Sequence, residues 1–289
     1  MILHSIEAGT LLVDGGAAFG VVPKKVWKKR YTCNDDNYCL FNMRCLLIDT
    51  GDRRILIDNG AGDKQLKYLK HYGFRDVINF EAELNKLGYR CADITDMVFT
   101  HLHFDHCGGS TKYNADKSKA ELVFPNATHW VGEAQWNNFL QPNVREDDSY
   151  FPENMLPVFE AGKLKLVNKN LFICPEVEVR LFNGHTVGQL VPYIHRADVT
   201  FVYVGDVIPV VANVPLAWVS SYDVQPLRSM EEKKILLDEA AAKHQILLFE
   251  HDAYNECCTV ATQYKKHKVE KTFSFDTVRV DGAKLLSVS

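Results

Sequence analysis

The stretch "VFTHLHFDHCGGS", residues 98–110, decides how this chain is interpreted. It places three histidines and an aspartate within six consecutive positions, directly after a short apolar run. The apolar run indicates a strand that ends near Phe99, so His101 and His103 lie just past its carboxyl end with side chains able to turn the same way. Two imidazoles placed in this way can chelate one metal ion.

The second half of this stretch offers ligands to another ion. Asp105 and His106 fall where a turn enters a helix, and they supply a carboxylate oxygen and an imidazole nitrogen. Gly108 and Gly109 allow the backbone to pass close to its neighbours. A polar loop with solvated histidines is the alternative, but four ligand-type side chains in six positions favour a metal site.

Three further strand ends carry the same kind of residue. The segment "VEVRLFNGHTVGQ" breaks at a glycine and presents His185, "VTFVYVGDVIP" breaks at a glycine and presents Asp206, and "QILLFEHD" presents His251. A single histidine or aspartate after a strand is usually a cap or a surface residue. Together with the first stretch, these residues indicate one pocket built at strand ends.

The order of the elements predicts a mixed α/β class. Residues 45–58, "CLLIDTGDRRILID", are two apolar runs around a Thr-Gly-Asp turn, which is typical of a hairpin. Residues 80–100 predict a helix that ends at Gly88 and leads into a strand from about Met97. We therefore expect mixed sheets with helices packed outside them, an α/β or α+β layered sandwich.

A second helix-to-strand unit is predicted near the end of the chain. Ser229 and Glu232 have the spacing of a capping box at the start of a good helix, which passes into the strand "QILLFE". Residues 141–157 fit no period and predict a long loop, a candidate lid. No linker, repeat or low-complexity block divides the chain, so we predict one domain over residues 1–289.

Composition narrows the function. The chain has 289 residues, 46% of them hydrophobic, and a formal net charge of -4, so no positive field favours nucleic acid or an anionic membrane. The first residues lack a signal-peptide pattern, and no apolar run could span a bilayer, so we expect a soluble, cytoplasmic protein. Its eight cysteines form no CxxC pair, and we expect free, mostly buried thiols. The neighbours Cys257 and Cys258 could bridge only with strain.

The ligand-type residues resemble the metallo-β-lactamase fold superfamily, whose motif HxHxDH is followed by a histidine, an aspartate and a final histidine. The resemblance extends from the early hairpin to the last strand and implies a four-layer αββα sandwich of two mixed β-sheets flanked by helices. It implies that His101, His103 and His185 hold one metal ion. It also implies that the other ligands are shared out as follows: Asp105, His106 and His251 at a second ion, with Asp206 bridging the two.

Two cations held close together imply hydrolysis. A metal-bridging hydroxide would attack a lactone or ester carbonyl, while the ions stabilise the developing charge. We expect Asp105 to act mainly as a ligand, because a metal-bound carboxylate is a poor base, with proton transfer to the leaving group as a secondary role. Zinc is the expected metal, with manganese and iron as alternatives, since imidazole and carboxylate ligands suit all three.

Within the superfamily, "DGGAAFGVVPK", "THLHFDHCGG", "FPNATHWVGEAQW" and "GDVIP" are similar to the branch of methyl parathion hydrolase and its lactonase-like relatives. This similarity implies a promiscuous lactonase or esterase with organophosphate side activity and a small-molecule substrate; relatives suggest a homodimer. Acyl-homoserine lactonases place a tyrosine three residues after the bridging aspartate, where this chain has Pro209. A phosphodiesterase and a di-iron redox enzyme on the same fold are the alternatives.

Several other residues are weaker candidates. Ser221 and Asp223 lie between two ligand-bearing strands and could orient a histidine. Cys107 follows a ligand, but we expect it to pack in the core. Four aromatic residues are candidates for the substrate wall, although core packing is the usual role of such residues: Phe104, Phe19, Trp136 and Trp218. Six histidines have no ligand context: His4, His71, His129, His195, His244 and His267.

Overall fold

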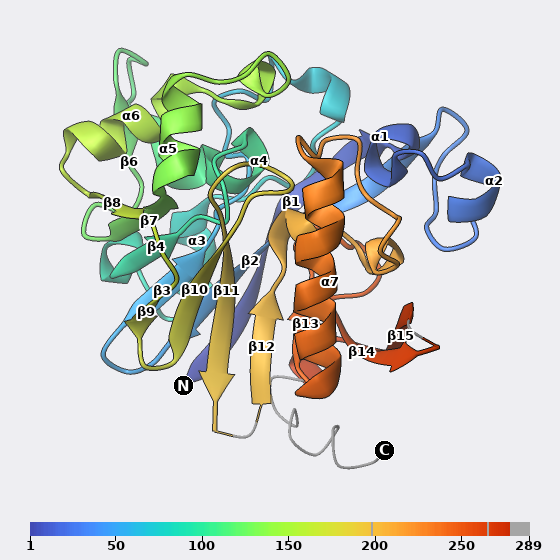
Figure 1. The fold of residues 1–289 in the computed structure, drawn as a ribbon. Helices are drawn as coiled ribbons and strands as arrows, with labels where there is room; N and C mark the ends of the chain where they lie inside the picture. The colour runs from blue at the N-terminus through green and yellow to red at the C-terminus, as the bar shows by residue number, and fades with distance from the viewer. Residues whose placement is uncertain (198, 265, 278–289) are drawn as a thin grey trace. The chain divides into compact units, whose positions relative to one another are not determined.

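The computed structural model describes residues 1–197, 199–264 and 266–277 (Figure 1). The chain forms two compact units, each assembled from separate segments. The first unit consists of Met1–Leu11, Asn42–Asn168 and Gly188–Leu190. The second consists of Leu12–Phe41, Lys169–Val187 and the described residues between Val191 and Thr277.

The first large sheet has six strands. They lie in the order β1 (Ile2–Asp14), β2 (Tyr38–Asp49), β3 (Arg54–Ile57), β4 (Asp96–Val98), β7 (Thr128–Gly132) and β8 (Leu164–Val167). Strands β2 and β3 pair antiparallel, with Leu46 opposite Ile57, which confirms the predicted hairpin. Strand β4 lies parallel to both β3 and β7, so the sheet is mixed.

Short helices and a small ribbon complete the first unit. The helices are α3 (Phe80–Lys86), α4 (Phe104–Cys107), α5 (Glu133–Leu140) and α6 (Pro152–Glu160), with 3-10 turns η1 (Lys70–Tyr72), η2 (Cys91–Asp93), η3 (Gly108–Ser110) and η4 (Asp147–Ser149). Strands β5 (Thr111–Tyr113) and β6 (Ala120–Leu122) form the ribbon. Helix α3 is followed by Gly88 in the left-handed region, as predicted.

The prediction of a loop over residues 141–157 is wrong for its C-terminal part. Residues 152–157 belong to helix α6, which begins with a proline. Proline suits the first helical turn because its missing N–H has no partner there and its fixed φ matches the helix. The irregular composition of this stretch therefore concealed a helix start.

The second large sheet has seven strands. They lie in the order β15 (Lys266–Phe273), β14 (Cys257–Gln263), β13 (Ile246–Leu248), β12 (Val199–Tyr203), β11 (Gln189–Arg196), β10 (Val177–Phe182) and β9 (Leu171–Cys174). Strands β12 and β13 pair in parallel, whereas β13 and β14 pair antiparallel. The second sheet is therefore also mixed, and the predicted class of mixed α/β with mixed sheets and helices is confirmed.

Helix α7 (Pro226–Ala242) connects the parallel strands β12 and β13, beside which it lies in Figure 1. Its residues Leu236, Leu237 and Ala240 are buried in one core cluster with side chains of the sheet. This burial places the crossover helix against the strands and supplies the apolar contact that stabilises it. The shorter elements of this unit are α1 (Gly15–Phe19), α2 (Lys24–Trp27), η5 (Gly205–Val207) and η6 (Val211–Asn213).

The capping box predicted at Ser229 and Glu232 is wrong. Helix α7 begins one turn earlier, with Pro226 in its first turn and Gln225 at the N-cap. The Ser229 hydroxyl donates to the Gln225 carbonyl, as expected inside a helix. The Glu232 carboxylate instead accepts from the backbone N–H of Gly184, in the loop that precedes a predicted ligand.

All eight cysteines are free thiols, and six of them are buried, which confirms that prediction. The Cys107 Sγ donates to the Leu102 carbonyl at 3.3 Å, and burial raises the pKa of this thiol to about 12. Cys107 therefore packs in the core, as expected. In the described ranges, no helix has both the length and the apolar character needed to cross a membrane.

Candidate metal centre

The first unit positions His101 and His103 at the carboxyl end of β4. Both side chains are buried, and His101 Nε2 lies 2.9 Å from His103 Nδ1. The ligand atoms of these two residues lie within 4.8 Å of one another, which is close enough to share one ion. The predicted chelating pair is therefore brought together by the structure.

The hydrogen bonds around His101 decide which of its nitrogens faces His103. The Thr100 hydroxyl lies 2.6 Å from Asp58 Oδ2, to which it donates its proton. The same hydroxyl oxygen lies 3.1 Å from His101 Nδ1, so it accepts that N–H. His101 Nε2 is then left with its lone pair directed at His103.

The remote nitrogen of His103 is held by a buried carboxylate. His103 Nε2 lies 3.1 Å from Glu146 Oε1, and Glu146 is only 3% exposed. The Tyr150 hydroxyl and the Asn138 amide each donate to the same carboxylate at 2.9 Å, and the Asn143 amide also donates to it. An ionised carboxylate accepts only, so His103 Nε2 carries the proton and Nδ1 presents a lone pair.

His106 repeats this arrangement in helix α4. Its Nδ1 lies 3.1 Å from Asp58 Oδ2, and its Nε2 lies 3.7 Å from Asp105 Oδ1. Because Asp58 accepts the N–H at Nδ1, the lone pair at Nε2 faces another acceptor. Asp105 and His106 are thus brought together as predicted, in a helical turn directly after His103.

Sequence reasoning missed both supporting carboxylates of the first unit. Asp58 follows β3 with a φ of 53°, in the left-handed region that non-glycine residues rarely adopt. The segment "LIDNG" ends a strand with an aspartate, as "VYVGD" does, and this signal was available. Glu146 gave no comparable signal, since it lies in an irregular acidic stretch.

The two glycines after His106 permit a close backbone approach, as predicted. A Cβ on Gly108 would lie 2.0 Å from the Ala61 carbonyl oxygen, and one on Gly109 would lie 2.3 Å from that of Asn59. The Lys64 ammonium donates to the Gly108 carbonyl, and burial lowers the pKa of this lysine to about 8. These contacts fix the turn that carries Asp105 and His106.

The second unit brings the other three predicted ligands together, with His185 and His251 on either side of Asp206. His185 Nε2 lies 3.4 Å from Asp206 Oδ2, and His251 Nε2 lies 2.9 Å from Asp206 Oδ1. The remote His185 Nδ1 lies 2.9 Å from Asp223 Oδ1, and Asp223 is buried. The suggestion that Asp223 orients a histidine is therefore supported by geometry, whereas the Ser221 hydroxyl donates to the Gly16 carbonyl.

Local structure explains how these three side chains are presented. Asp206 follows β12 in a 3-10 turn that begins with Gly205 at a φ of 46°. His251 follows β13, and its ring stacks on Phe41 with centroids 5.5 Å apart. The loop before His185 lies against α7, because a Cβ on Gly184 would be 2.5 Å from Ser229 Cα.

The donor set in each unit fits a divalent metal ion. Supporting groups take the N–H of His101, His103, His106 and His185, so the opposite nitrogens of these rings are acceptors that face other acceptors. Two facing acceptors repel each other unless a proton or a cation lies between them. Imidazole nitrogens and carboxylate oxygens are the ligands that zinc, manganese and iron bind.

The aromatic candidates pack mainly within their own units. Phe104 is buried beside Tyr72, at 5.1 Å between ring centroids. Trp136 stacks on Phe139 at 5.2 Å. The remaining two belong to one aromatic group: Phe19, which is fully buried, and Trp218, which is partly exposed and lies edge-on to it. Their role as a substrate wall stays a prediction.

Two of the histidines without a ligand context are held by structural hydrogen-bond partners. His129 Nδ1 lies 3.1 Å from the Ala127 carbonyl, and burial lowers the pKa of this imidazole to about 4. His267 Nε2 lies 2.7 Å from Asp238 Oδ1. These two rings belong to the buried framework of their units.

The fold and the paired histidine and aspartate ligands define a class of metal-binding α/β protein. Residues 43–251 match the family model of the metallo-beta-lactamase superfamily. This match covers more than half of the chain, and the chain therefore belongs to the metallo-beta-lactamase superfamily.

Two solved structures are similar to this chain over most of its length. A probable metal-dependent hydrolase of Staphylococcus aureus is 29% identical, with a TM-score of 0.84 over 94% of this chain and 98% of that one. AidC, a dizinc quorum-quenching lactonase, is 21% identical, with a TM-score of 0.76 over 94% and 95% of the two chains. At 21% identity, this similarity shows only that AidC and this chain share a fold.

Sequence relatives match over a shorter stretch. Probable metallo-hydrolases of Mycobacterium bovis and Mycobacterium tuberculosis are each 37% identical over 73 residues, which is 22% of this chain. The matched stretch spans 24% of the length of these relatives.

Proposed function

We propose that this protein is a metal-dependent hydrolase. The observation that carries the proposal is the set of imidazole nitrogens whose lone pairs face other acceptors, because a cation makes such contacts favourable. Membership of the superfamily supports the same activity, as does the similarity to the probable metal-dependent hydrolase of Staphylococcus aureus.

Two divalent ions are the proposed cofactors, with zinc first and manganese or iron as alternatives. The order of the ligands along the chain supports the assignment implied by the family. His101, His103 and His185 would hold one ion. The remaining ligands would be Asp105, His106 and His251 at the other ion, with Asp206 shared. When bound, such ions lower the pKa of water and polarise a carbonyl or phosphoryl oxygen.

The protein's own carboxylates prepare the ligand atoms. Glu146 accepts the N–H at Nε2 of His103. Asp58 accepts the N–H at Nδ1 of His106, and Asp223 accepts the N–H at Nδ1 of His185. Each carboxylate fixes the tautomer and the ring orientation, so the opposite nitrogen is ready to bind a cation. These three carboxylates are buried, which keeps water from competing for the same N–H groups.

Asp105 is proposed to have a second role besides ligation. Its side chain is 15% exposed, whereas the neighbouring His106 side chain is fully buried. A partly accessible carboxylate beside the reaction centre can hold the proton that passes to the leaving oxygen. Ligation remains its main role, because binding a cation makes a carboxylate a weaker base.

A small lactone or ester is the proposed substrate, with organophosphate hydrolysis as a side activity. AidC is a lactonase whose structure contains the product N-hexanoyl-L-homoserine, and its fold supports this choice. The hydrolase AbOPH, in the beta lactamase superfamily, has the same fold, with a TM-score of 0.77 at 20% identity. Pro209, three residues after Asp206, argues for lactones other than acyl-homoserine lactones.

The test is initial-rate proton release against γ- and δ-lactones, aryl esters and one phosphotriester. The protein would be stripped of metal and reloaded with zinc or manganese, and bound metal would be counted in parallel. His101→Ala removes a proposed ligand. His195→Gln is the matched control, because His195 lies on β11 beside Thr200 with no predicted ligand role.

Turnover that returns with metal, fails in His101→Ala and persists in His195→Gln supports the proposal. The best substrate then distinguishes a lactonase from an esterase. Two bound ions without turnover on this panel would refute the lactonase-like assignment and favour the alternatives, a phosphodiesterase or a di-iron redox enzyme. Oxygen uptake by the iron-loaded protein would separate these two.

Location and assembly stay predictions. The eight free thiols support the expected cytoplasmic location, because cytosolic proteins keep their cysteines reduced. A homodimer is expected from relatives, and analytical ultracentrifugation of the full chain would test it. No nucleic-acid or membrane partner is expected for a chain with a formal net charge of -4.

A further inference from the structure

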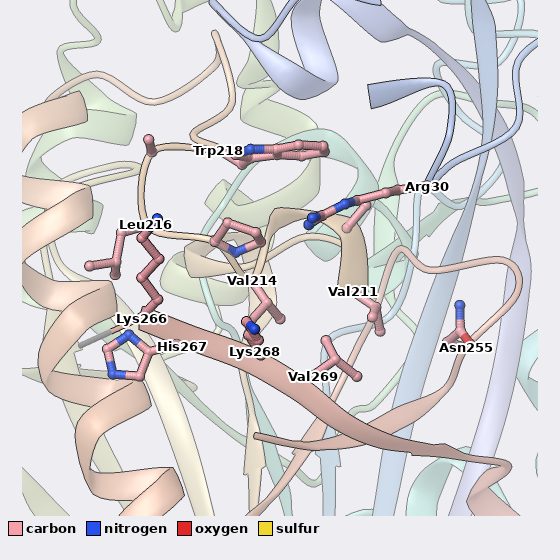
Figure 2. A pocket seen from close by; sticks show the side chains of 13 residues that line it. Arg30, Val211, Val214, Leu216, Trp218, Asn255, Lys266, His267, Lys268 and Val269 are labelled. Atoms are coloured by element: carbon pink, nitrogen blue, oxygen red, sulfur yellow. The ribbon is translucent and has the colours of Figure 1, made fainter. Parts of the chain in front are cut away.

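The second unit contains a cavity of about 750 Å³ that contains none of the predicted metal ligands. Figure 2 shows Arg30 and Trp218 on one side of it and the start of β15, from Lys266 to Val269, on another. The turn η6 and the loop that follows it supply a third wall. Small-molecule sites in proteins typically have volumes of roughly 300–1,000 Å³, so this cavity has the size of a ligand site.

Part of the cavity lining is apolar. Val211, Leu216 and Val269 line it, and each packs against the core cluster of this unit while remaining only partly buried. The buried Val214 lines the cavity beside them. Partly buried aliphatic side chains around one hollow would gain free energy if a ligand's hydrocarbon removed them from water.

The charges around the cavity all have one sign. Arg30, Lys266 and Lys268 are among the 13 lining residues, and none of these 13 is Asp or Glu. The whole chain has the opposite balance, with 37 acidic against 33 basic residues. The His267 ring, which also lines the cavity, has its Nε2 2.7 Å from Asp238. The local field therefore favours an anion.

The cavity is preformed, because hydrogen bonds and a cation–π contact hold its lining residues in place. The Lys233 side chain of α7 is buried, and its ammonium donates to the carbonyls of Asn213, Pro215 and Trp218 at 2.9–3.2 Å. These three bonds fix the loop that forms one wall. The Arg30 guanidinium lies 4.6 Å from the Trp218 ring centroid, a cation–π contact that orients it at the cavity. A preformed site loses less entropy on binding.

We propose that this cavity binds an amphipathic carboxylate, a straight-chain acid anion, as a site separate from the predicted metal ligands. The head would meet Arg30, Lys266 and Lys268, and the chain would cover the aliphatic wall. Charge complementarity selects the anion, because the 13 lining residues include three cations and no acid, and these cations repel a cationic head and give a neutral head no advantage. The apolar wall selects a long chain over a short one.

Isothermal titration of the full-length protein with decanoate, below its micelle concentration, tests the proposal. Decanol keeps the chain without the charge, and acetate keeps the charge without the chain. We expect saturable binding of decanoate at one site, and binding at least about tenfold weaker for decanol and acetate. Stripping the metal should leave decanoate binding unchanged, so this result is independent of the proposed hydrolase activity.

Variants locate the binding. Arg30→Gln and Lys268→Gln should each weaken decanoate binding by about three- to tenfold. Leu216→Asn should weaken decanoate binding because it removes an apolar contact with the hydrocarbon chain of the ligand. Lys243→Gln is the matched control, since Lys243 is an exposed cation at the end of α7 and does not line the cavity. Thermal unfolding of each variant would check that it folds.

Three results would overturn the proposal. The first is the absence of saturable decanoate binding. The second is binding that is equal for decanol, or unchanged in both charge variants, because the cations would then have no role. The third is decanoate binding that disappears with the metal, because the anion would then occupy the metal centre.

Discussion

Replacing Glu146 with glutamine is expected to weaken metal binding without unfolding the protein. The Glu146 carboxylate is 3% exposed and accepts from His103, Tyr150, Asn138 and Asn143. Glutamine has the same shape but only one acceptor oxygen, and its amide N–H groups would face other donors. His103 would then lose the group that holds its N–H and directs its other nitrogen toward the proposed ion.

The magnitude follows from the number of contacts that one substitution disturbs. Removing a carboxylate that supports a metal-bound histidine typically lowers metal affinity by about 10–100-fold, or roughly 1.4–2.8 kcal/mol. Because four donors converge on Glu146, we expect the upper half of this range. Tyr150→Phe removes only one of the four hydrogen bonds to Glu146 and should lower the metal affinity by a few-fold at most.

A zinc competition titration against a chromophoric chelator measures this affinity directly, without reference to turnover. Glu153→Gln is the matched control, because Glu153 in α6 accepts from Gln65 rather than from a predicted ligand. Glu146→Gln with a metal affinity within about twofold of the wild type, in a protein whose thermal unfolding is unchanged, would refute the reasoning.

Three further outcomes are expected. Gly108→Ala should lower the melting temperature by several degrees at least, as followed by circular dichroism, because its Cβ would lie 2.0 Å from the Ala61 carbonyl oxygen; an unchanged melting temperature would contradict this contact. The pKa of His129 is lowered from 6.5 to about 4, so the unfolded chain binds more protons in this window and stability should fall by up to about 3 kcal/mol as the pH drops from 6.5 to 4. His129→Phe should flatten that part of the urea-unfolding profile against pH, and an equal slope in both proteins would exclude His129 as its source. Removing metal with a chelator should lower the melting temperature. If the metal had been present at 100 times its Kd, the lost stabilisation is about 2.7 kcal/mol. A melting temperature that does not respond to metal would count against a bound ion.

The predicted metal ligands were easier to recognise in the sequence than the carboxylates that support them. HxHxDH is compact, and its spacing alone places four ligand atoms near one strand end. Asp58 lies 48 residues from His106 in the chain, and Glu146 lies 43 residues from His103. Only the tertiary structure brings such distant residues into contact, so no local sequence pattern predicts them.

The errors in predicted secondary structure have a similar cause. Ser229 and Glu232 match a capping box by spacing, but Glu232 accepts the backbone N–H groups of the loop before His185. Pro226 suits the first turn and starts the helix earlier than the spacing suggests. A local motif competes with tertiary partners, and here the tertiary partner prevails because it satisfies buried N–H groups.

The sequence by itself determined the family, the class of fold and the candidate ligands. These follow from short-range information: a metal needs particular atoms at fixed spacing, and alternating apolar runs specify strands wherever they occur. The tertiary structure decided which nitrogen of each imidazole is held by a carboxylate and which is left as an acceptor. It also decided that Arg30, Trp218 and the start of β15 enclose one cavity. Both outcomes depend on contacts between residues far apart in the chain, which local spacing does not encode.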